Sequence, residues 1–124
     1  MAAVLAEWAG TPAPGFRARI VSDVPVAKGV SSSAAIEVAS LLALARARSI
    51  DLDGRPLALL AQRAENRVVG APCGVMDPMT AACGEADRLL ALRCQPATIE
   101  GQLQLPPDLR LWACLLYTSD AADE

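Results

Sequence analysis

Histidine is absent from the 124-residue sequence, and aromatic residues are scarce. Without histidine, a Cys/His zinc site and a Ser-His or Cys-His nucleophilic pair are excluded, so any general base must be a carboxylate or a lysine. Aromatic residues make up 3% of the chain, although 53% of it is hydrophobic. We therefore expect a core of alanine, leucine and valine, a composition that suits helices packed on a sheet.

The sequence also lacks the patterns of secreted and membrane proteins. No run of about 20 apolar residues is free of charge, and the first residues carry Glu7 but no basic residue, unlike a signal peptide. The four cysteines show no CxxC spacing, which disfavours an all-cysteine zinc site. The sequence favours buried, reduced thiols in a cytoplasmic protein with neither a membrane nor a nucleic acid as partner.

The formal net charge of −3 comes from the last residues. The segment 114–124 carries three acidic residues and no basic one, and the rest of the chain has 11 acidic and 11 basic residues. This segment resembles a translated sequencing adaptor. We therefore expect residues 114–124 to be a non-native tail and residues 1–113 to be part of one domain.

Hydrophobic periodicity predicts an α+β domain. The stretch 32–47 is almost wholly apolar, with Glu37 its only charge before Arg46, and should be a helix buried on most sides. A second helix should begin at Pro56 and bury one face; this face contains Leu57, Leu59, Leu60, Ala64 and Val68. The expected helices are 2–9, 32–47, 56–69 and 76–83, and the expected strands are 16–23, 86–94, 97–105 and 109–113.

A loop with one glycine and three serines, "KGVSSS", precedes the apolar helix. Helix N-termini have unpaired N–H groups and a partial positive charge, and glycine lets the backbone approach an anion. The loop could therefore bind phosphate, or the serines could simply cap the helix. It is not a Walker loop, because Lys28 precedes Gly29 and no second glycine lies five residues upstream.

Two motifs resemble the GHMP kinase superfamily over about residues 1–112. "PVAKGVSSSAA" (25–35) is similar to its second motif, although Ala27 stands where glycine is usual. "AENRVVGAPCGVMDPMTAACGEADRLLALRCQPA" (64–97) is similar to the galactokinase and L-arabinokinase branch. The resemblance implies a two-layer α+β N-terminal domain related to ribosomal protein S5 domain 2, incomplete here.

The resemblance also implies an ATP and Mg²⁺ site. Ser33 and Glu65 match the magnesium ligands, Asp77 matches the base that acts on the anomeric hydroxyl of a sugar, and the N–H of Gly74 matches a sugar contact. The residues that match the phosphate-binding loop are Lys28, Gly29, Val30, Ser31, Ser32 and Ser33.

Each acidic residue also has a structural interpretation. Glu65, with Arg63 and Arg67 nearby, could be a solvated surface charge. Asp77 could cap a short helix with Pro78, which replaces the usual glutamine, at its first position. Nothing near Cys73 would activate it as a nucleophile, so a packing role is expected.

The function favoured by the sequence is an ATP-dependent 1-kinase for galactose or L-arabinose. Two alternatives stay open: a non-catalytic ligand-binding domain of the same fold, and a kinase for another alcohol such as mevalonate or homoserine. The superfamily's N-terminal motif and C-terminal domain are not found in this sequence, so we expect the isolated chain to be inactive.

Overall fold

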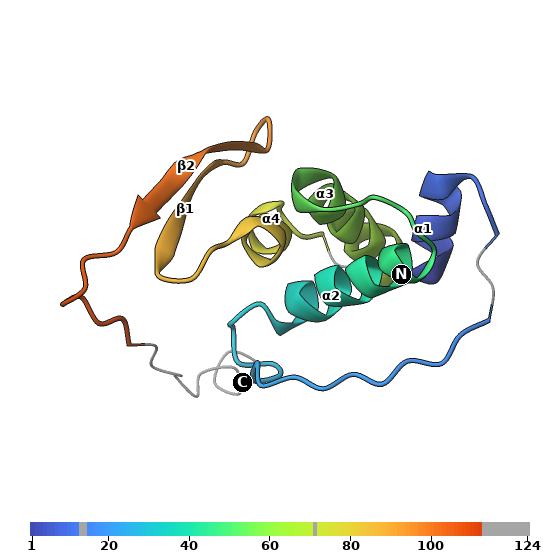
Figure 1. Cartoon of the computed structure of the whole chain (residues 1–124), viewed down its shortest axis with the longest axis horizontal. Coiled ribbons are helices and arrows are strands. Elements are labelled where there is room, and N and C mark those ends of the chain that lie inside the picture. The colour runs from blue at the N-terminus through green and yellow to red at the C-terminus, as the bar shows by residue number, and fades with distance from the viewer. Residues whose placement is uncertain (13–14, 71, 113–124) are drawn as a thin grey trace, which may run out of the picture.

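The computed structural model describes residues 1–12, 15–70 and 72–112, and it contains helices followed by one β-hairpin. The helices lie side by side, and the hairpin packs beside the last of them (Figure 1). This confirms the mixed helix and strand content expected from the sequence. In chain order the elements are α1 (Ala2–Ala9), α2 (Ser32–Ala47), α3 (Gly54–Ala64), the π-helical turn η1 (Glu65–Val69), α4 (Met76–Cys83), β1 (Arg88–Arg93) and β2 (Thr98–Gln104).

Helices α1, α2 and α3 bury a shared core of leucine, valine and alanine. Leu41 of α2 and Ala61 of α3 are fully buried in it, and Leu5 of α1 is almost so. Helix α2 is buried along one face only, since Ala39 and Ala43 are exposed on its other side. The expectation of burial on most sides was wrong, because alanine is small enough to stand on an exposed helix surface without a large apolar patch.

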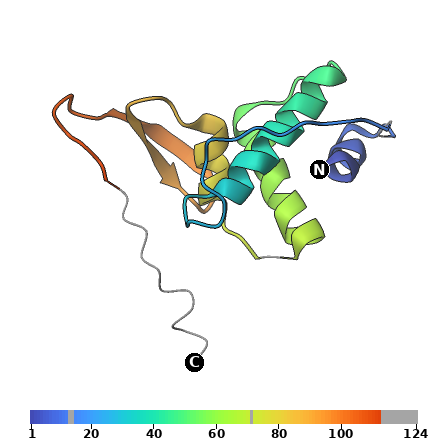
Figure 2. The same cartoon turned by 90° about the horizontal axis from the view of Figure 1, so that it is seen from below.

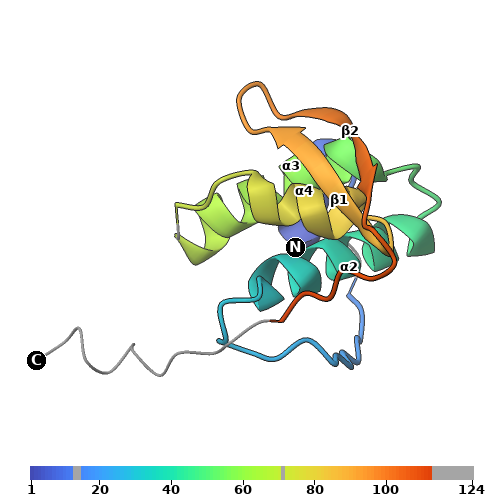
Figure 3. The same cartoon turned by 90° about the vertical axis from the view of Figure 1, so that its left-hand side faces the viewer.

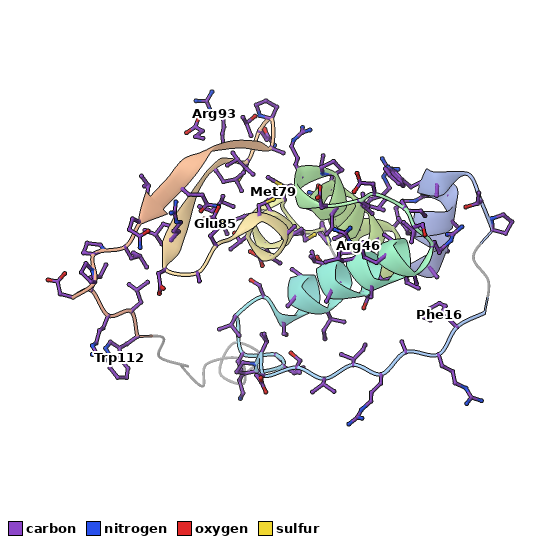
Figure 4. All side chains as sticks on the ribbon, in the orientation of Figure 1. Phe16, Arg46, Met79, Glu85, Arg93 and Trp112 are labelled. Atoms are coloured by element: carbon purple, nitrogen blue, oxygen red, sulfur yellow. The ribbon has the colours of Figure 1, made fainter. Side chains whose placement is uncertain are left out.

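A second core cluster joins α4 to the hairpin. Met79 of α4 is fully buried against Ala58 of α3, and Leu90 and Leu92 of β1 pack on the same cluster. Figure 4 places Met79 between α4 and α3. The hairpin is therefore anchored to the helices through α4.

The hairpin is antiparallel, and its register pairs Arg88 with Gln104 and Leu90 with Gln102. An irregularity between Ala91 and Leu92 shifts the register by one residue before the turn. The strands expected at 86–94 and 97–105 are thus confirmed with slightly shorter ends. Figure 3 shows the hairpin crossing in front of α3 and α4.

Two other expected strands are not formed. Residues 16–23 are extended but unpaired, and run along the outside of α2 (Figures 1 and 2). A β-strand needs a partner for its N–H and C=O groups, and none of the described strands lies beside this segment, so Ile20 and Val21 are exposed. Residues 109–112 likewise form no strand, and residue 113 lies outside the described residues.

The helix expected at 56–69 begins two residues earlier, at Gly54, and changes character at its end. After Ala64 the chain continues as the π-helical turn η1, which Gly70 closes in a left-handed conformation with its N–H donating to the carbonyl of Glu65 at 3.1 Å. A π-turn takes more residues per turn than an α-helix and rotates the later side chains. Val68, expected on the buried face, is therefore 63% exposed.

Among the described residues, no helix has both the length and the apolar character needed to cross a membrane.

We expect Gly84→Ala to destabilise the fold by about 1–3 kcal/mol, the range for steric overpacking. A Cβ atom at this position would lie 2.6 Å from the carbonyl oxygen of Thr80, in the last turn of α4. Gly101→Ala in β2 is the matched control, because a Cβ atom there meets nothing within 4 Å. Urea unfolding of both variants measures the difference, and equal midpoints would show that the Gly84 contact is relieved without cost.

Candidate functional site

The loop before α2 has an alternating backbone conformation. Ala27, Gly29 and Ser31 have φ values of 56°, 70° and 59°, all in the left-handed region. Where left-handed residues alternate with right-handed ones, successive N–H groups turn toward one point, and such concave nests bind anions. Ala27 adopts this conformation at a cost of about 1–2 kcal/mol that glycine would avoid, which gives a physical reason for the glycine usual at this position.

The loop leads directly into the N-terminus of α2. The first intrahelical hydrogen bond is donated by the N–H of Ala35 to the carbonyl of Ser31 at 3.1 Å. The N–H groups of residues 32–34 come before this ladder and point out of the helix end. The N–H of Ala27 donates to Ser32 Oγ at 3.4 Å, which closes the loop. Lys28, Gly29 and Val30 are exposed, so the loop is open to an anion from solvent.

Asp77 contacts this loop, although it lies 46 residues after Ser31 in the sequence. Ser31 Oγ donates a hydrogen bond to Asp77 Oδ2 at 2.7 Å, in a partly buried position. Helix α4 begins at Met76 and has no side-chain cap, so the interpretation of Asp77 as its capping residue was wrong. Pro78 is buried in the first turn of α4, where a missing N–H breaks no intrahelical hydrogen bond.

Glu65 is buried. Only 9% of it is exposed, so the interpretation as a solvated surface charge was wrong. It begins the π-helical turn η1 and lies close enough to Glu37 of α2 for the two charges to interact. Among the described residues, no hydrogen bond joins Ser33 to Glu65. Another acidic residue, Glu37, lies one turn after Ser33 on α2.

Sequence reasoning did not assign Glu37 to the site. It is 5% exposed, and its Oε2 atom has no hydrogen-bond partner within residues 1–12, 15–70 and 72–112. Burial, and then the charge of Glu65, raise the pKa of Glu37 to about 7, and the N-terminal ammonium opposes this shift. One signal could have found it: Glu37 is a lone acidic residue in an apolar helix, four positions after Ser33, and therefore on the same helix face.

Gly74 lies in a different environment from Asp77. It lines a cleft of about 420 Å³ between α3, residues 73–75 and the turn at 94–97. Neither Ser31 nor Asp77 lines this cleft. The structure thus brings Asp77 to the serine loop but does not place Gly74 in the same cavity.

Cys73 is half-buried and held by its backbone, which accepts from Gln62 Nε2 at 3.2 Å and donates to Asn66 Oδ1 at 2.9 Å. Burial and Glu65 raise the pKa of its thiol to about 11, which agrees with a packing role and disfavours a nucleophile. All three described cysteines are free, but Cys73 and Cys83 are only half-buried and Cys94 is exposed, so the expectation of buried thiols was wrong for these three. Cys114 lies outside the described residues.

We expect Glu37→Gln to change how stability depends on pH. The pKa of Glu37 rises from 4.5 to about 7 on folding, so the folded state binds more protons between these values and stability falls as pH rises through that window. The loss of unfolding free energy above pH 7 is about 3.5 kcal/mol at most, at about 1.4 kcal/mol per pKa unit. Urea unfolding at pH 5 and pH 8 should show a smaller decrease for Glu37→Gln than for the unsubstituted chain.

Asp108→Asn is the control for this measurement, because Asp108 is exposed. It should keep the pH dependence of the unsubstituted chain. A Glu37→Gln variant with the same decrease between pH 5 and pH 8 would contradict the assignment of this proton to Glu37.

The sequence is similar to a known protein family and to several known proteins. The family model described as the GHMP kinases N terminal domain matches residues 1–85. L-arabinokinase from Arabidopsis thaliana is 56% identical over 93 residues, which are 75% of this chain and 9% of the relative. Galactokinase from Roseiflexus sp. (strain RS-1) is 42% identical over 106 residues, which are 86% of this chain and 27% of the relative. Galactokinase from Pyrococcus furiosus is 36% identical over 95 residues, which are 77% of this chain and 27% of the relative.

The chain therefore spans about a quarter of these galactokinases and less than a tenth of the L-arabinokinase. The family model covers more than half of the chain, and it includes the serine loop, Glu65 and Asp77. The chain belongs to the GHMP kinase family, as a segment that matches its N-terminal domain.

Proposed function

We propose that this chain is part of the ATP-binding N-terminal domain of a sugar 1-kinase that phosphorylates galactose or L-arabinose at the anomeric hydroxyl. The observation that carries this proposal is the hydrogen bond from Ser31 to Asp77. It joins an anion-binding loop to a carboxylate, the two parts that a phosphoryl transfer needs side by side. The proposal includes a cytoplasmic location and an architecture related to ribosomal protein S5 domain 2.

The loop would hold the nucleotide. Phosphate oxygens would accept hydrogen bonds from the backbone N–H groups at the start of α2, with the helix dipole favouring the negative charge. The left-handed Gly29 and Ser31 shape the backbone for this contact. Lys28, Val30 and the hydroxyls of Ser32 and Ser33 complete the loop and would stabilise the phosphates by charge and further hydrogen bonds.

The residues also fit a magnesium ion. Mg²⁺ is usually held by one or two carboxylates together with water and substrate phosphates rather than by an all-protein cage. Among the residues that the structure describes, no group of three or more His, Cys, Asp or Glu could hold a metal without such additional ligands. Ser33 and Glu65 would bind the ion, which would neutralise phosphate charge. A cation would also offset the buried charge of Glu65 and satisfy the unpartnered Oε2 of Glu37.

Asp77 would act as general base. Its carboxylate would accept the proton of the anomeric hydroxyl while that oxygen attacks the γ-phosphorus and the bond to ADP breaks. Gly74, three residues before Asp77, would contribute its backbone N–H to the sugar. The sugar is proposed from the relatives, which are a galactokinase in two cases and an L-arabinokinase in the third.

We expect Asp77→Asn, in a full-length kinase that carries this segment, to lower kcat by at least about 100-fold, the usual contribution of a general base. ADP release with galactose, L-arabinose and glucuronate as acceptors measures it. Nucleotide binding should be retained, because the loop stays intact. Asp51→Asn, at an exposed carboxylate between α2 and α3, is the matched control and should leave kcat unchanged.

The same assay separates the two alternatives. A non-catalytic ligand-binding domain would show no turnover with any acceptor and no effect of Asp77→Asn. A kinase for another alcohol would release ADP with mevalonate or homoserine and not with the sugars.

We expect the isolated 124-residue chain to release negligible ADP with any of these sugars. Phosphoryl transfer requires the acceptor, the nucleotide and the base to be held together, and the chain spans only a fraction of its relatives. A coupled ADP-release assay of the purified chain tests this, and turnover close to that of the full-length kinase would show that these residues suffice.

A further inference from the structure

Ser31 stands at the N-cap of α2 but does not cap the helix. An N-cap serine normally has an extended backbone, and its side-chain oxygen accepts from an N–H of the first turn. Ser31 instead has φ 59° and ψ 38°, and it makes no side-chain cap bond. Its hydroxyl is directed to Asp77 Oδ2 on another helix.

The backbone conformation of Ser31 also indicates that its surroundings hold this residue in place. A non-glycine residue in the left-handed region costs conformational free energy and persists where its surroundings hold it there. In this conformation the hydroxyl lies 2.7 Å from Asp77 Oδ2. Helices α2 and α4 also pack directly on one another, so the contact joins two fixed elements.

A serine hydroxyl has one proton to donate. While Ser31 Oγ donates to Asp77, the same hydroxyl cannot donate to a phosphate oxygen, which only accepts. The side chain of Ser31 therefore hydrogen-bonds to Asp77. A phosphate would be bound by the backbone of Ser31 and by the neighbouring residues.

From this geometry we propose that Ser31 is a positioning residue for Asp77 rather than a side-chain ligand of the nucleotide, an inference that rests on the proposed kinase function. The hydrogen bond fixes Asp77 Oδ2 and with it the direction of the second carboxylate oxygen, Oδ1, which would accept the proton of the acceptor hydroxyl. Because Ser31 belongs to the phosphate loop, the base and the loop are held in one arrangement.

The test is Ser31→Gly in a full-length kinase that carries this segment. Glycine adopts the left-handed backbone freely, so the substitution removes the hydroxyl without adding strain. We expect kcat to fall about 10- to 100-fold, as for the loss of a hydrogen bond to a charged group, while the KM for ATP changes less than about twofold. Ser31→Asn should recover part of kcat, because asparagine tolerates this conformation and its amide can donate to Asp77.

Ser49→Gly is the matched control. Ser49 is also a serine in the left-handed region, with φ 54°, but it is exposed and lies just beyond the other end of α2. It should leave kcat and KM unchanged. Both variants should have melting temperatures close to that of the unsubstituted kinase. A change in kcat of Ser31→Gly is then not caused by partial unfolding.

Two results would overturn the inference. A KM for ATP raised at least tenfold with kcat retained would make the hydroxyl a nucleotide ligand, and unchanged kinetics would give it no role. In both cases the kinase function stands if Asp77→Asn is inactive. An unsubstituted full-length protein that phosphorylates none of the acceptors would instead remove the proposed function, and the positioning role with it.

Discussion

Close packing between alanine-bearing helices determines where the candidate site residues lie. Ala45 on α2, and Ala61 and Ala64 on α3, are fully buried in the core that these helices share. A methyl side chain lets two backbones approach closely, and a packed interior then leaves little room for a helix to shift. This contact fixes the direction of α2, and with it the point at which the helix end and its partial positive charge meet the first turn of α4.

The same packing places two carboxylates where water cannot solvate them. Glu37 and Glu65 lie on the α2 and α3 sides of the helical core, and the described residues give neither an ion pair with lysine or arginine. A buried charge without a partner is costly, and a carboxylate such as that of Glu37, whose Oε2 has no hydrogen-bond partner among the described residues, either binds a proton or binds a cation. The raised pKa of Glu37 is the first of these responses, and a magnesium ion beside the phosphate loop would be the second.

Two of the five non-glycine residues with positive φ in the described part of the chain lie in the loop that carries the proposed chemistry. Ala27 and Ser31 hold left-handed conformations within five residues of each other, on either side of Gly29. Such conformations gather where a site needs its backbone groups aimed in advance. By contrast, the segment at 16–23 that leads into this loop has no strand beside it, and its apolar residues are exposed. The loop is therefore positioned by the helices that follow it.

The amino-acid sequence by itself determined the helices, the two strands that form the hairpin and the family. Apolar periodicity marked α2 and α3, strand-like runs at 86–94 and 97–105 marked the two strands, and the motifs around Ser31 and Asp77 marked the kinase resemblance, because each of these signals is contained in a short stretch of chain. It could not determine that residues 16–23 stay unpaired, since pairing depends on a partner strand that local pattern does not supply. Nor could it show the turn at η1 that exposes Val68.

Only the tertiary structure decided which partners the site residues have. The distance from Ser31 to Asp77, the burial of Glu65 and the unpartnered oxygen of Glu37 all depend on how α2, α3 and α4 pack. Serine before a helix reads as a cap, and aspartate before proline reads as a helix start, because local propensity contains no information on residues 46 positions away. Packing overrides that propensity when it brings a hydroxyl and a carboxylate within hydrogen-bonding distance.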